Sequence, residues 1–220
     1  MSERSKTVDL LRQIRLFGVL TLQERLSLSR ITVQRKKRKH TTVYEENESA
    51  EAVYGIVSGL VKTLRKDSPD RIGFFATGDF LPGVWPQRGA RYEETAETIS
   101  QTALVKIPIA EFAAWLERNP AAAAKISRAY ERAIMGTQET ADAESRGRAF
   151  LLQLADHCGR VTGGKVRVGI PMTNQSFALT IGTTKENGEL LLREWHERGI
   201  ADMGRSGFVI HDVEALKMTK

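Results

Sequence analysis

Between residues 172 and 211, the sequence sets two short amphipathic helices on either side of a single glycine and follows them with a hairpin. Few small folds accept that order of elements, so this segment constrains the fold more than any other feature. Met172–Gln175 opens the first helix, with Thr173 or Asn174 as its N-cap. Gly182 ends that helix, because a left-handed residue there makes the tight turn.

A second helix is predicted to follow at once. Thr183-Thr184-Lys185-Glu186 has the composition of a capping box with Thr183 as the cap. Its buried face is predicted to consist of Gly188, Leu191, Leu192 and Trp195. Gly188 would let this helix cross closely over the first. Gly199 stops the helix, and residues 200–211 predict a strand, a turn and a strand. With a short strand at 166–170, this is the order of a winged helix-turn-helix.

A capped helix in this position presents its first side chains to the major groove of DNA, and its free N–H groups can face phosphate. Lysine can donate to guanine, glutamate can accept from cytosine, and asparagine can contact adenine. Arg205 and Ser206 in the wing suit phosphate contacts. The candidate DNA-binding residues are Thr173, Asn174, Thr183, Thr184, Lys185, Glu186, Asn187, Glu189, Arg205 and Ser206. A helical protein–protein module of the same shape is the alternative, and the ordered hairpin makes it less well supported.

Composition narrows the class of protein. The net charge is +6 and the pI about 9.5, which favours polyanionic partners. Cys158 is the only cysteine, which suits a reducing compartment and excludes a cysteine-ligated iron–sulfur cluster. The four histidines show no metal-ligand spacing, so no metal or other cofactor is expected, and no histidine is placed to ligate a haem. His196 is predicted to be a helix-surface residue.

The sequence also argues against an enzyme and against a membrane protein. No nucleophile–base pair at workable spacing and no glycine-rich phosphate loop is evident. No apolar window approaches the ~18 to 20 residues that cross a bilayer, and the N-terminus has no apolar stretch of signal-peptide length. We therefore expect a cytoplasmic protein.

The first half of the chain predicts helices over residues 7–30 and then a β-rich region. The predicted strands are Ile31–Arg35, Thr41–Tyr44, Val53–Val57, Leu60–Leu64, Ile72–Ala76, Thr95–Ile99 and Ala103–Ile107. Short strands at this spacing predict an antiparallel barrel or sandwich. The basic run Arg35–Lys39 is expected to be a solvated edge, with a nucleic-acid patch as the less favoured interpretation.

Helical patterning returns at Ile109. Asn119 and Pro120 suit the N-cap and first position of a long helix, predicted to run to about Glu144. A heptad-like stripe along it comprises Ile126, Tyr130, Ala133, Thr137 and Thr140. The stripe can pack on its own domain or pair with the same helix of a second chain, and its length favours a dimer interface. Gly147 is predicted to be a hinge before the next helix.

This organisation resembles the cyclic-AMP receptor protein and fumarate–nitrate regulator (Crp/Fnr) superfamily of transcription regulators. The motifs that carry the resemblance are Tyr54-Gly55-Ile56-Val57-Ser58-Gly59, Gly78-Asp79-Phe80, Asn119-Pro120, Arg148-Ala149-Phe150-Leu151-Leu152 and Thr183-Thr184-Lys185-Glu186. They lie in the order and spacing of the superfamily across nearly the whole chain.

The resemblance implies an α+β fold. It consists of an N-terminal cyclic-nucleotide-binding-like β-barrel (a jelly roll) over residues 1–118, a long dimerisation helix over 119–145, and a C-terminal winged helix-turn-helix over 146–220. It also implies a homodimer on a pseudo-palindromic operator of double-stranded DNA, a small effector bound by the barrel, and RNA polymerase as a partner.

Three departures from the superfamily pattern concern the effector and the operator. The Gly-Glu and Arg-Ser pairs that hold cyclic AMP are replaced by Pro82-Gly83 and Glu94-Thr95, and a carboxylate is electrostatically wrong beside a phosphate. The adenine-contacting pair falls near Glu131-Arg132. Leu190 stands where the superfamily often has an arginine, so the operator should differ from the usual one.

The sequence thus predicts a regulator that responds to an effector other than cyclic AMP, or to none. Two alternatives stay open: a cyclic-nucleotide sensor that uses Arg91 three residues upstream of Glu94, or a ligand-binding scaffold with a degenerate DNA domain. The candidate effector-binding residues are Phe80, Trp85, Arg91, Tyr92, Tyr130 and Glu131.

Overall fold

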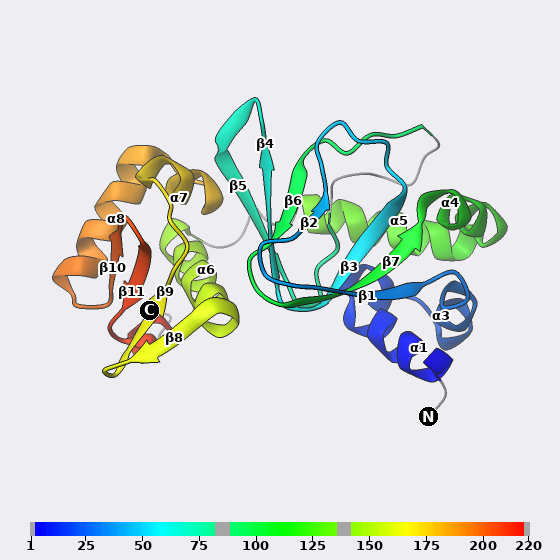
Figure 1. Ribbon diagram of the computed structural model, residues 1–220, viewed down its shortest axis with the longest axis horizontal. Helices are drawn as coiled ribbons and strands as arrows, with labels where there is room; N and C mark the ends of the chain where they lie inside the picture. The colour runs from blue at the N-terminus through cyan, green and yellow to red at the C-terminus, as the bar shows by residue number, and fades with distance from the viewer. Residues whose placement is uncertain (1–2, 82–88, 136–141, 218–220) are drawn as a thin grey trace. The chain divides into compact units, whose positions relative to one another are not determined.

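The computed structural model describes residues 3–81, 89–135 and 142–217. Predicted sites at Trp85, Thr137 and Thr140 lie outside these residues. The chain forms two compact units, one built mainly from residues before position 138 and the other mainly from residues after it. Figure 1 labels most elements of both units, and each unit is described by itself.

The first unit begins with three helices: α1 (Glu3–Gln13), α2 (Arg15–Gly18) and α3 (Leu22–Leu28). Their apolar residues Leu11, Ile14 and Phe17 are completely buried in the core of the unit. The capping box at the start of α3 is confirmed. Thr21 Oγ1 accepts from the Glu24 N–H at 3.2 Å, and the Glu24 carboxylate accepts from the Thr21 N–H at 2.7 Å.

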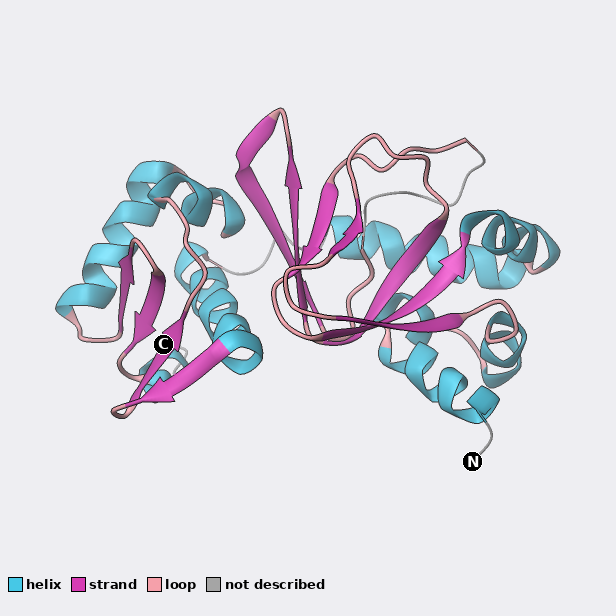
Figure 2. Ribbon diagram, in the orientation of Figure 1, coloured by secondary structure: helices cyan, strands magenta, loops and turns pink. Residues whose placement is uncertain are grey.

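All seven predicted strands are present, with ends shifted by at most four residues. They are β1 (Val33–Lys37), β2 (Thr42–Tyr44), β3 (Ala52–Ser58), β4 (Leu60–Arg65), β5 (Ser68–Ala76), β6 (Thr95–Thr98) and β7 (Thr102–Pro108). They form two sheets, ordered β1-β7-β3 and β2-β6-β4-β5, which appear in magenta in Figure 2. The described strands therefore make an open two-sheet jelly roll rather than a closed barrel.

Two helices follow, α4 (Ile109–Arg118) and α5 (Pro120–Met135). The Asn119 side-chain amide donates to the Trp115 carbonyl at 2.7 Å, so it satisfies the end of α4, and Pro120 opens α5 as predicted. The prediction of one long helix to Glu144 was wrong. The backbone at Asp142 is extended, with φ −68° and ψ 169°, and its side chain caps a separate helix.

The predicted dimer stripe also needs correction. Ile126 is completely buried within the core of its own unit, and half-buried Tyr130 packs edge-on against Phe80 with ring centroids 6.4 Å apart. The jelly roll is thus large enough to cover the start of the stripe, and Ile126 faces it. The exposed residues of α5 on the other side are Ala121, Ala124, Arg128 and Glu131.

The second unit is the predicted winged helix-turn-helix with an extra strand, β8, and a short extra helix, α9. Its elements are α6 (Ala143–Cys158), β8 (Gly159–Thr162), β9 (Lys165–Val168), α7 (Asn174–Thr180), α8 (Lys185–Glu197), β10 (Ala201–Gly204), β11 (Gly207–Ile210) and α9 (Val213–Lys217). The strands form one antiparallel sheet in the order β10-β11-β9-β8. Strand β8 was not predicted, because three glycines in residues 159–164 suggested a loop.

Gly147 was predicted to be a hinge, but its role in the structure is to allow close packing of two helices. Gly147 lies inside α6, and a Cβ added there would be 2.8 Å from the ring of Trp195. Trp195 is completely buried and contacts Phe177 with ring centroids 6.0 Å apart. Gly147 therefore lets α6 and α8 approach each other around this tryptophan.

The predicted close crossing of α7 and α8 is confirmed. Gly182 has φ +65°, the left-handed conformation that turns the chain between them. A Cβ added at Gly188 would lie 2.8 Å from the Cβ of Ala178, which is too close for any pair of methyl groups. Because both positions are fixed to helix backbone, only a shift of one helix could relieve that contact.

Gly188→Ala should therefore destabilise the fold although alanine favours helices. Overpacking costs about 1–3 kcal/mol, against a helix-propensity gain of about 1 kcal/mol. Chemical denaturation of the full chain should show a lower midpoint than for Glu194→Ala, an exposed control on the same helix. Equal midpoints for the two variants would show that the helices do not depend on this contact.

Candidate DNA-binding surface and effector region

Both helices of the helix-turn-helix are capped by threonine side chains. Thr173 Oγ1 accepts from the Ser176 N–H at 3.0 Å, and Thr184 Oγ1 accepts from the Asn187 N–H at 3.3 Å. The predicted capping box at Thr183 was wrong by one residue. The Thr183 N–H donates to the Ala178 carbonyl at 2.9 Å, which holds Thr183 in the turn and leaves Thr184 as the N-cap.

The first turn of α8 presents an outward polar surface. Lys185, Glu186 and Asn187 are all exposed. Leu190, one turn further along, is 50% exposed, so it does not pack inward. A leucine in that place can contact a thymine methyl group but cannot donate to guanine.

Glu189 is held by two neighbours, a neutral amide and a charged ammonium group. It accepts from the Asn174 amide at 3.1 Å and lies 3.8 Å from the Lys185 ammonium. These contacts join the start of α7 to the start of α8 at the surface. They also reduce the repulsion that Glu189 would exert on a DNA backbone.

The wing lies where predicted. Arg205 and Ser206 are exposed at the turn between β10 and β11. Gly207 at that turn has φ +121°, and a Cβ there would be 2.1 Å from the Val168 carbonyl oxygen, so the turn is pressed against β9. Ordinary side chains are excluded at Gly207, which fixes how the two exposed residues are presented.

A shallow cavity of about 270 Å³ separates the helices from the wing. It is lined by Asn174, Glu189, Leu192, Arg193, His196, Asp202 and Met203. Arg193 is exposed on α8 and was not among the predicted residues, although its position four residues after Glu189 could have indicated it. Because residues of both elements line this cavity, β10 lies beside α8, the second helix of the helix-turn-helix and hence its recognition helix.

Asp202 links the recognition helix to the wing through two histidines. Its carboxylate is 2.6 Å from His196 Nδ1 and 2.8 Å from His211 Nε2. The hydrogen bond and charge of Asp202 raise the pKa of His196, and those of both histidines lower the pKa of Asp202. Although His196 is exposed as predicted, its bond to Asp202 could not be foreseen, because only the pairing of β10 and β11 brings the three together.

An arginine from α6 holds the turn of the helix-turn-helix. Arg146 Nε donates to the Ile181 carbonyl at 2.6 Å, and its Nη2 donates to the Gly182 carbonyl at 3.0 Å. These carbonyls end α7 and lack helical partners. Arg146 therefore fixes the turn that sets the direction of α8.

The effector region predicted for the first unit contains a half-buried carboxyl group, that of Glu94. Glu94 is half-buried, and its Oε1 has no hydrogen-bond partner among the described residues. Burial raises the pKa of Glu94, and the neighbouring Glu93 raises it further. Both glutamates lie close enough to Tyr130 of α5 to add to the increase that burial causes in the pKa of its phenol.

The other predicted effector residues are scattered rather than gathered. Arg91 is exposed and donates to the Asn47 carbonyl, so it does not compensate Glu94. Tyr92 is buried, and its hydroxyl donates to the Ala52 carbonyl at 2.7 Å. Phe80 packs edge-on against Phe17, and Glu131 is exposed. Phe80 and Tyr130 contact each other, with their rings edge-on.

Comparison with known proteins supports both units. Residues 34–119 match the cyclic nucleotide-binding domain family, and residues 146–219 match the Crp-like helix-turn-helix domain family. The chain belongs to the Crp/Fnr superfamily of DNA-binding transcription regulators. Proteins of this superfamily are not enzymes.

Curated relatives and solved structures agree with this assignment. The transcriptional activatory protein AadR of Rhodopseudomonas palustris is 30% identical over 66% of this chain and 63% of its own, so the match spans less than two thirds of that relative. The nitrogen fixation regulation protein FixK of Azorhizobium caulinodans is 29% identical over 81% of this chain and 75% of its own.

A relative described as a CRP-like cAMP-activated global transcriptional regulator, from Mycobacterium tuberculosis, is 24% identical over 80% and 82% of the two chains. The solved structure of FixK2 from Bradyrhizobium japonicum has a TM-score of 0.52 at 23% identity, covering 85% of this chain and 96% of its own. That likeness supports the fold. In the described part of the chain, the helices are too short or too polar to span a bilayer.

The Asp202 cluster should make stability depend on pH. Because the folded pKa of His196 is raised, its contribution is complete below the unfolded value of about 6.5 and is lost as the pH rises through the folded value. Because the pKa of Asp202 is lowered, its contribution is complete above about pH 4 and is lost as the pH falls further. The cluster thus stabilises most between these limits.

We therefore expect Asp202→Asn to lower the unfolding midpoint of the full chain at pH 5.5 and to differ less from the wild type at pH 9. His196→Gln should remove most of this pH dependence and serves as the matched control. A difference between wild type and Asp202→Asn that is the same at both pH values would contradict the cluster's role.

Proposed function

We propose that the chain is a homodimeric, sequence-specific transcription regulator that binds a pseudo-palindromic operator in the cytoplasm and acts on RNA polymerase. The observation that carries the proposal is the capped start of α8, which exposes Lys185, Glu186 and Asn187 beside the wing. Thr184 and the free N–H groups of that first turn suit a phosphate, and the three side chains suit base edges.

Base contacts and phosphate contacts should respond differently to mutation. Lys185→Ala should weaken binding to the operator by about 1–3 kcal/mol and relax its sequence preference. Arg205→Ala should weaken operator and unrelated duplexes about equally and lower the salt dependence by about one phosphate contact. Binding titrations on operator and scrambled duplexes measure both effects.

Unchanged affinity in both variants would contradict the placement of α8 and the wing. No protection of any promoter fragment by the wild type at low salt, where electrostatic binding is strongest, would instead favour a ligand-binding scaffold with a degenerate DNA domain.

The dimer proposal rests on the superfamily and on the solvent-exposed face of α5. Ile126 is used by the core of its own unit, so the residues offered to a second chain are Ala121, Ala124, Arg128 and Glu131. Small residues at 121 and 124 allow two helices to approach closely. A coiled pairing along this face would place the two copies of α5 side by side.

Ala124→Arg should convert the dimer into a folded monomer, because a long charged side chain on this face blocks close helix pairing. Light scattering should give the mass of two wild-type chains and one variant chain, with an unchanged circular dichroism spectrum. Ile126→Ala, by contrast, should lower stability by about 2–5 kcal/mol, as expected for a core cavity. A dimeric Ala124→Arg variant would place the interface elsewhere.

We further propose that the effector, if one is required, is not cyclic AMP. At 4 Å, two negative charges repel by about 4 kcal/mol at an effective dielectric constant of about 20. Glu94 would impose that repulsion on a cyclic phosphate, and Arg91 is already bonded to Asn47. The carboxyl group at position 94 is the single observation behind this part of the proposal.

Titration of the full chain with cyclic AMP in a calorimeter should therefore give no saturable heat in the micromolar range. Glu94→Gln, which removes the charge but adds no phosphate donor comparable to arginine, should behave in the same way. One-to-one binding per subunit at micromolar concentration would overturn this proposal and favour a cyclic-nucleotide-responsive regulator.

A further inference from the structure

The excess positive charge lies entirely outside the DNA-binding unit. Residues 1–137 contain 22 lysines and arginines against 16 aspartates and glutamates, whereas residues 138–220 contain 11 of each. Neutralised phosphates supply a large part of protein–DNA affinity. A DNA-binding unit without net charge supplies less of that electrostatic contribution, which directs attention to the cations of the first unit.

Five of these cations are consecutive. We name them the basic strip: Arg35, Lys36, Lys37, Arg38 and Lys39. They occupy the end of β1 and the turn that follows it, and all except half-buried Lys37 are exposed. Among the described strands, β1 lies at the edge of its sheet and pairs with β7 alone. The strip therefore forms a continuous positive border, and its five charges account for most of the net +6.

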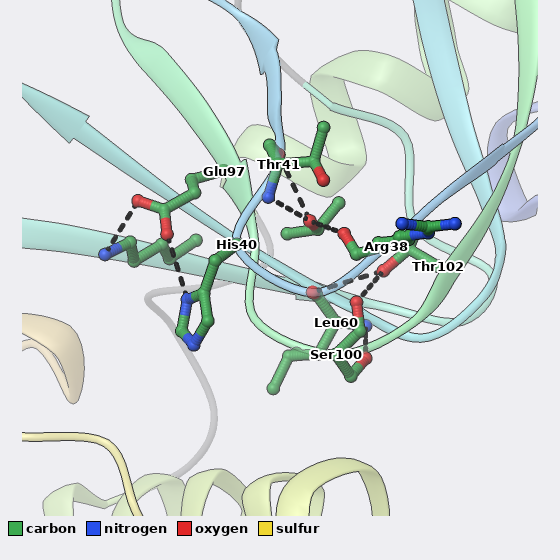
Figure 3. Close-up of polar contacts among 9 residues, drawn as sticks. Arg38, His40, Thr41, Leu60, Glu97, Ser100 and Thr102 are labelled. Atoms are coloured by element: carbon green, nitrogen blue, oxygen red, sulfur yellow. Dashed lines mark hydrogen bonds and ion pairs between the residues drawn. The ribbon is translucent and has the colours of Figure 1, made fainter.

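Cations near the strip are paired with acidic side chains, whereas those of the strip are not in the described part of the chain. Glu97 lies 3.1 Å from the Lys62 ammonium and 3.2 Å from His40 Nδ1 (Figure 3), and Glu51 lies 3.9 Å from the Lys106 ammonium. No ion pair joins any residue of the strip to an acidic side chain in the parts of the chain that the structure describes. The nearby carboxylates are thus bonded to other cations.

Buried hydrogen bonds fix the strip in place. Thr98, which is completely buried, donates to the Arg38 carbonyl at 2.6 Å and accepts from the Thr41 N–H at 2.9 Å (Figure 3). His40 between them adopts a left-handed φ of +57°, and its N–H donates to the Thr98 carbonyl at 2.7 Å. Holding the turn in this way places like charges side by side at a cost in repulsion. One or two lysines are enough to protect a sheet edge from aggregation, so protection alone does not explain five.

We propose that the basic strip binds the phosphates of duplex DNA beyond the operator. This inference rests on the proposed function, because the winged helix-turn-helix must first hold the DNA. Repeated cations with no hydrophobic side chain among them match a regular row of phosphates better than a protein interface, which needs apolar and aromatic anchors. DNA held by the same molecule also has a high effective concentration near the strip.

The test compares two triple variants of the full chain. Lys36→Gln/Arg38→Gln/Lys39→Gln removes three charges from the strip, and Arg12→Gln/Arg30→Gln/Arg118→Gln removes three exposed charges elsewhere in the same unit. Each protein is titrated with an operator-length duplex and with the same operator extended by about two helical turns on each side, at several salt concentrations. Thermal unfolding confirms that both variants are folded.

We expect the strip variant to bind the short duplex like the wild type and the extended duplex with a reduced salt slope. The slope should fall by about 0.9 for each phosphate that the strip no longer neutralises, or by about 2 to 3 per subunit. The control variant should retain the wild-type slope. Equal slopes for strip variant and wild type on the extended duplex, or an equal decrease in both variants, would overturn the proposal.

Failure of the proposed function would give a different result: the wild-type protein would bind the operator and a scrambled duplex with equal affinity. The extended scrambled duplex would then still test the strip through its salt slope. Unchanged DNA slopes, combined with a failure of the strip variant to bind purified RNA polymerase, would assign the strip to an acidic protein surface and so contradict the proposal.

Discussion

The contact between Gly188 of α8 and Ala178 of α7 determines how the recognition helix is held. No side chain larger than hydrogen fits at position 188, so the two helices cross at a fixed distance. Gly147 makes a similar approach possible between α6 and the buried ring of Trp195. Arg146 then secures the turn between the helices through two carbonyl oxygens. Exposed side chains at the start of α8 can be positioned accurately only because these buried contacts leave the helix no alternative.

The first unit has the jelly-roll fold of the cyclic nucleotide-binding domain family but different polar residues in the predicted effector region. Its core is ordinary, with aromatic and aliphatic side chains between the sheets and the helices. The residue that differs from the superfamily pattern is Glu94, whose half-buried carboxyl group lies near Tyr130. Such a carboxyl group offers no positive charge to a bound phosphate, and in its ionised form it repels one. If the effector is not cyclic AMP, as we propose, a few polar residues have changed while the strands of the framework have been kept.

Local patterns in the sequence were sufficient for most of the elements. Short β-rich runs separated by turn residues predicted all seven strands of the jelly roll, and Gly182 and the threonine-rich turn predicted the helix-turn-helix. The predictions failed where packing between distant segments decides. Strand β8 exists because β9 pairs with it, and Thr184 caps α8 because the Thr183 N–H is bonded to Ala178.

Two functional features could not be predicted from spacing at all. The stripe that begins at Ile126 has the period of a dimer seam, and a helix packed on its own domain has the same period, so only the burial of Ile126 distinguishes them. The link from His196 through Asp202 to His211 depends on β10 lying beside α8. Residues that act together here are separated in the sequence and are joined by tertiary structure.

The net positive charge of the chain lies in the first unit. The candidate DNA-binding surface lies in the second unit, which carries no net charge. In the proposed complex, two copies of α8 enter the major groove of one duplex. Hydroxyl-radical footprinting of the wild-type protein on its operator tests this directly. We expect two protected half-sites whose centres lie about one helical turn, or about 10 base pairs, apart. A single protected site, or uniform protection along the fragment, would contradict it.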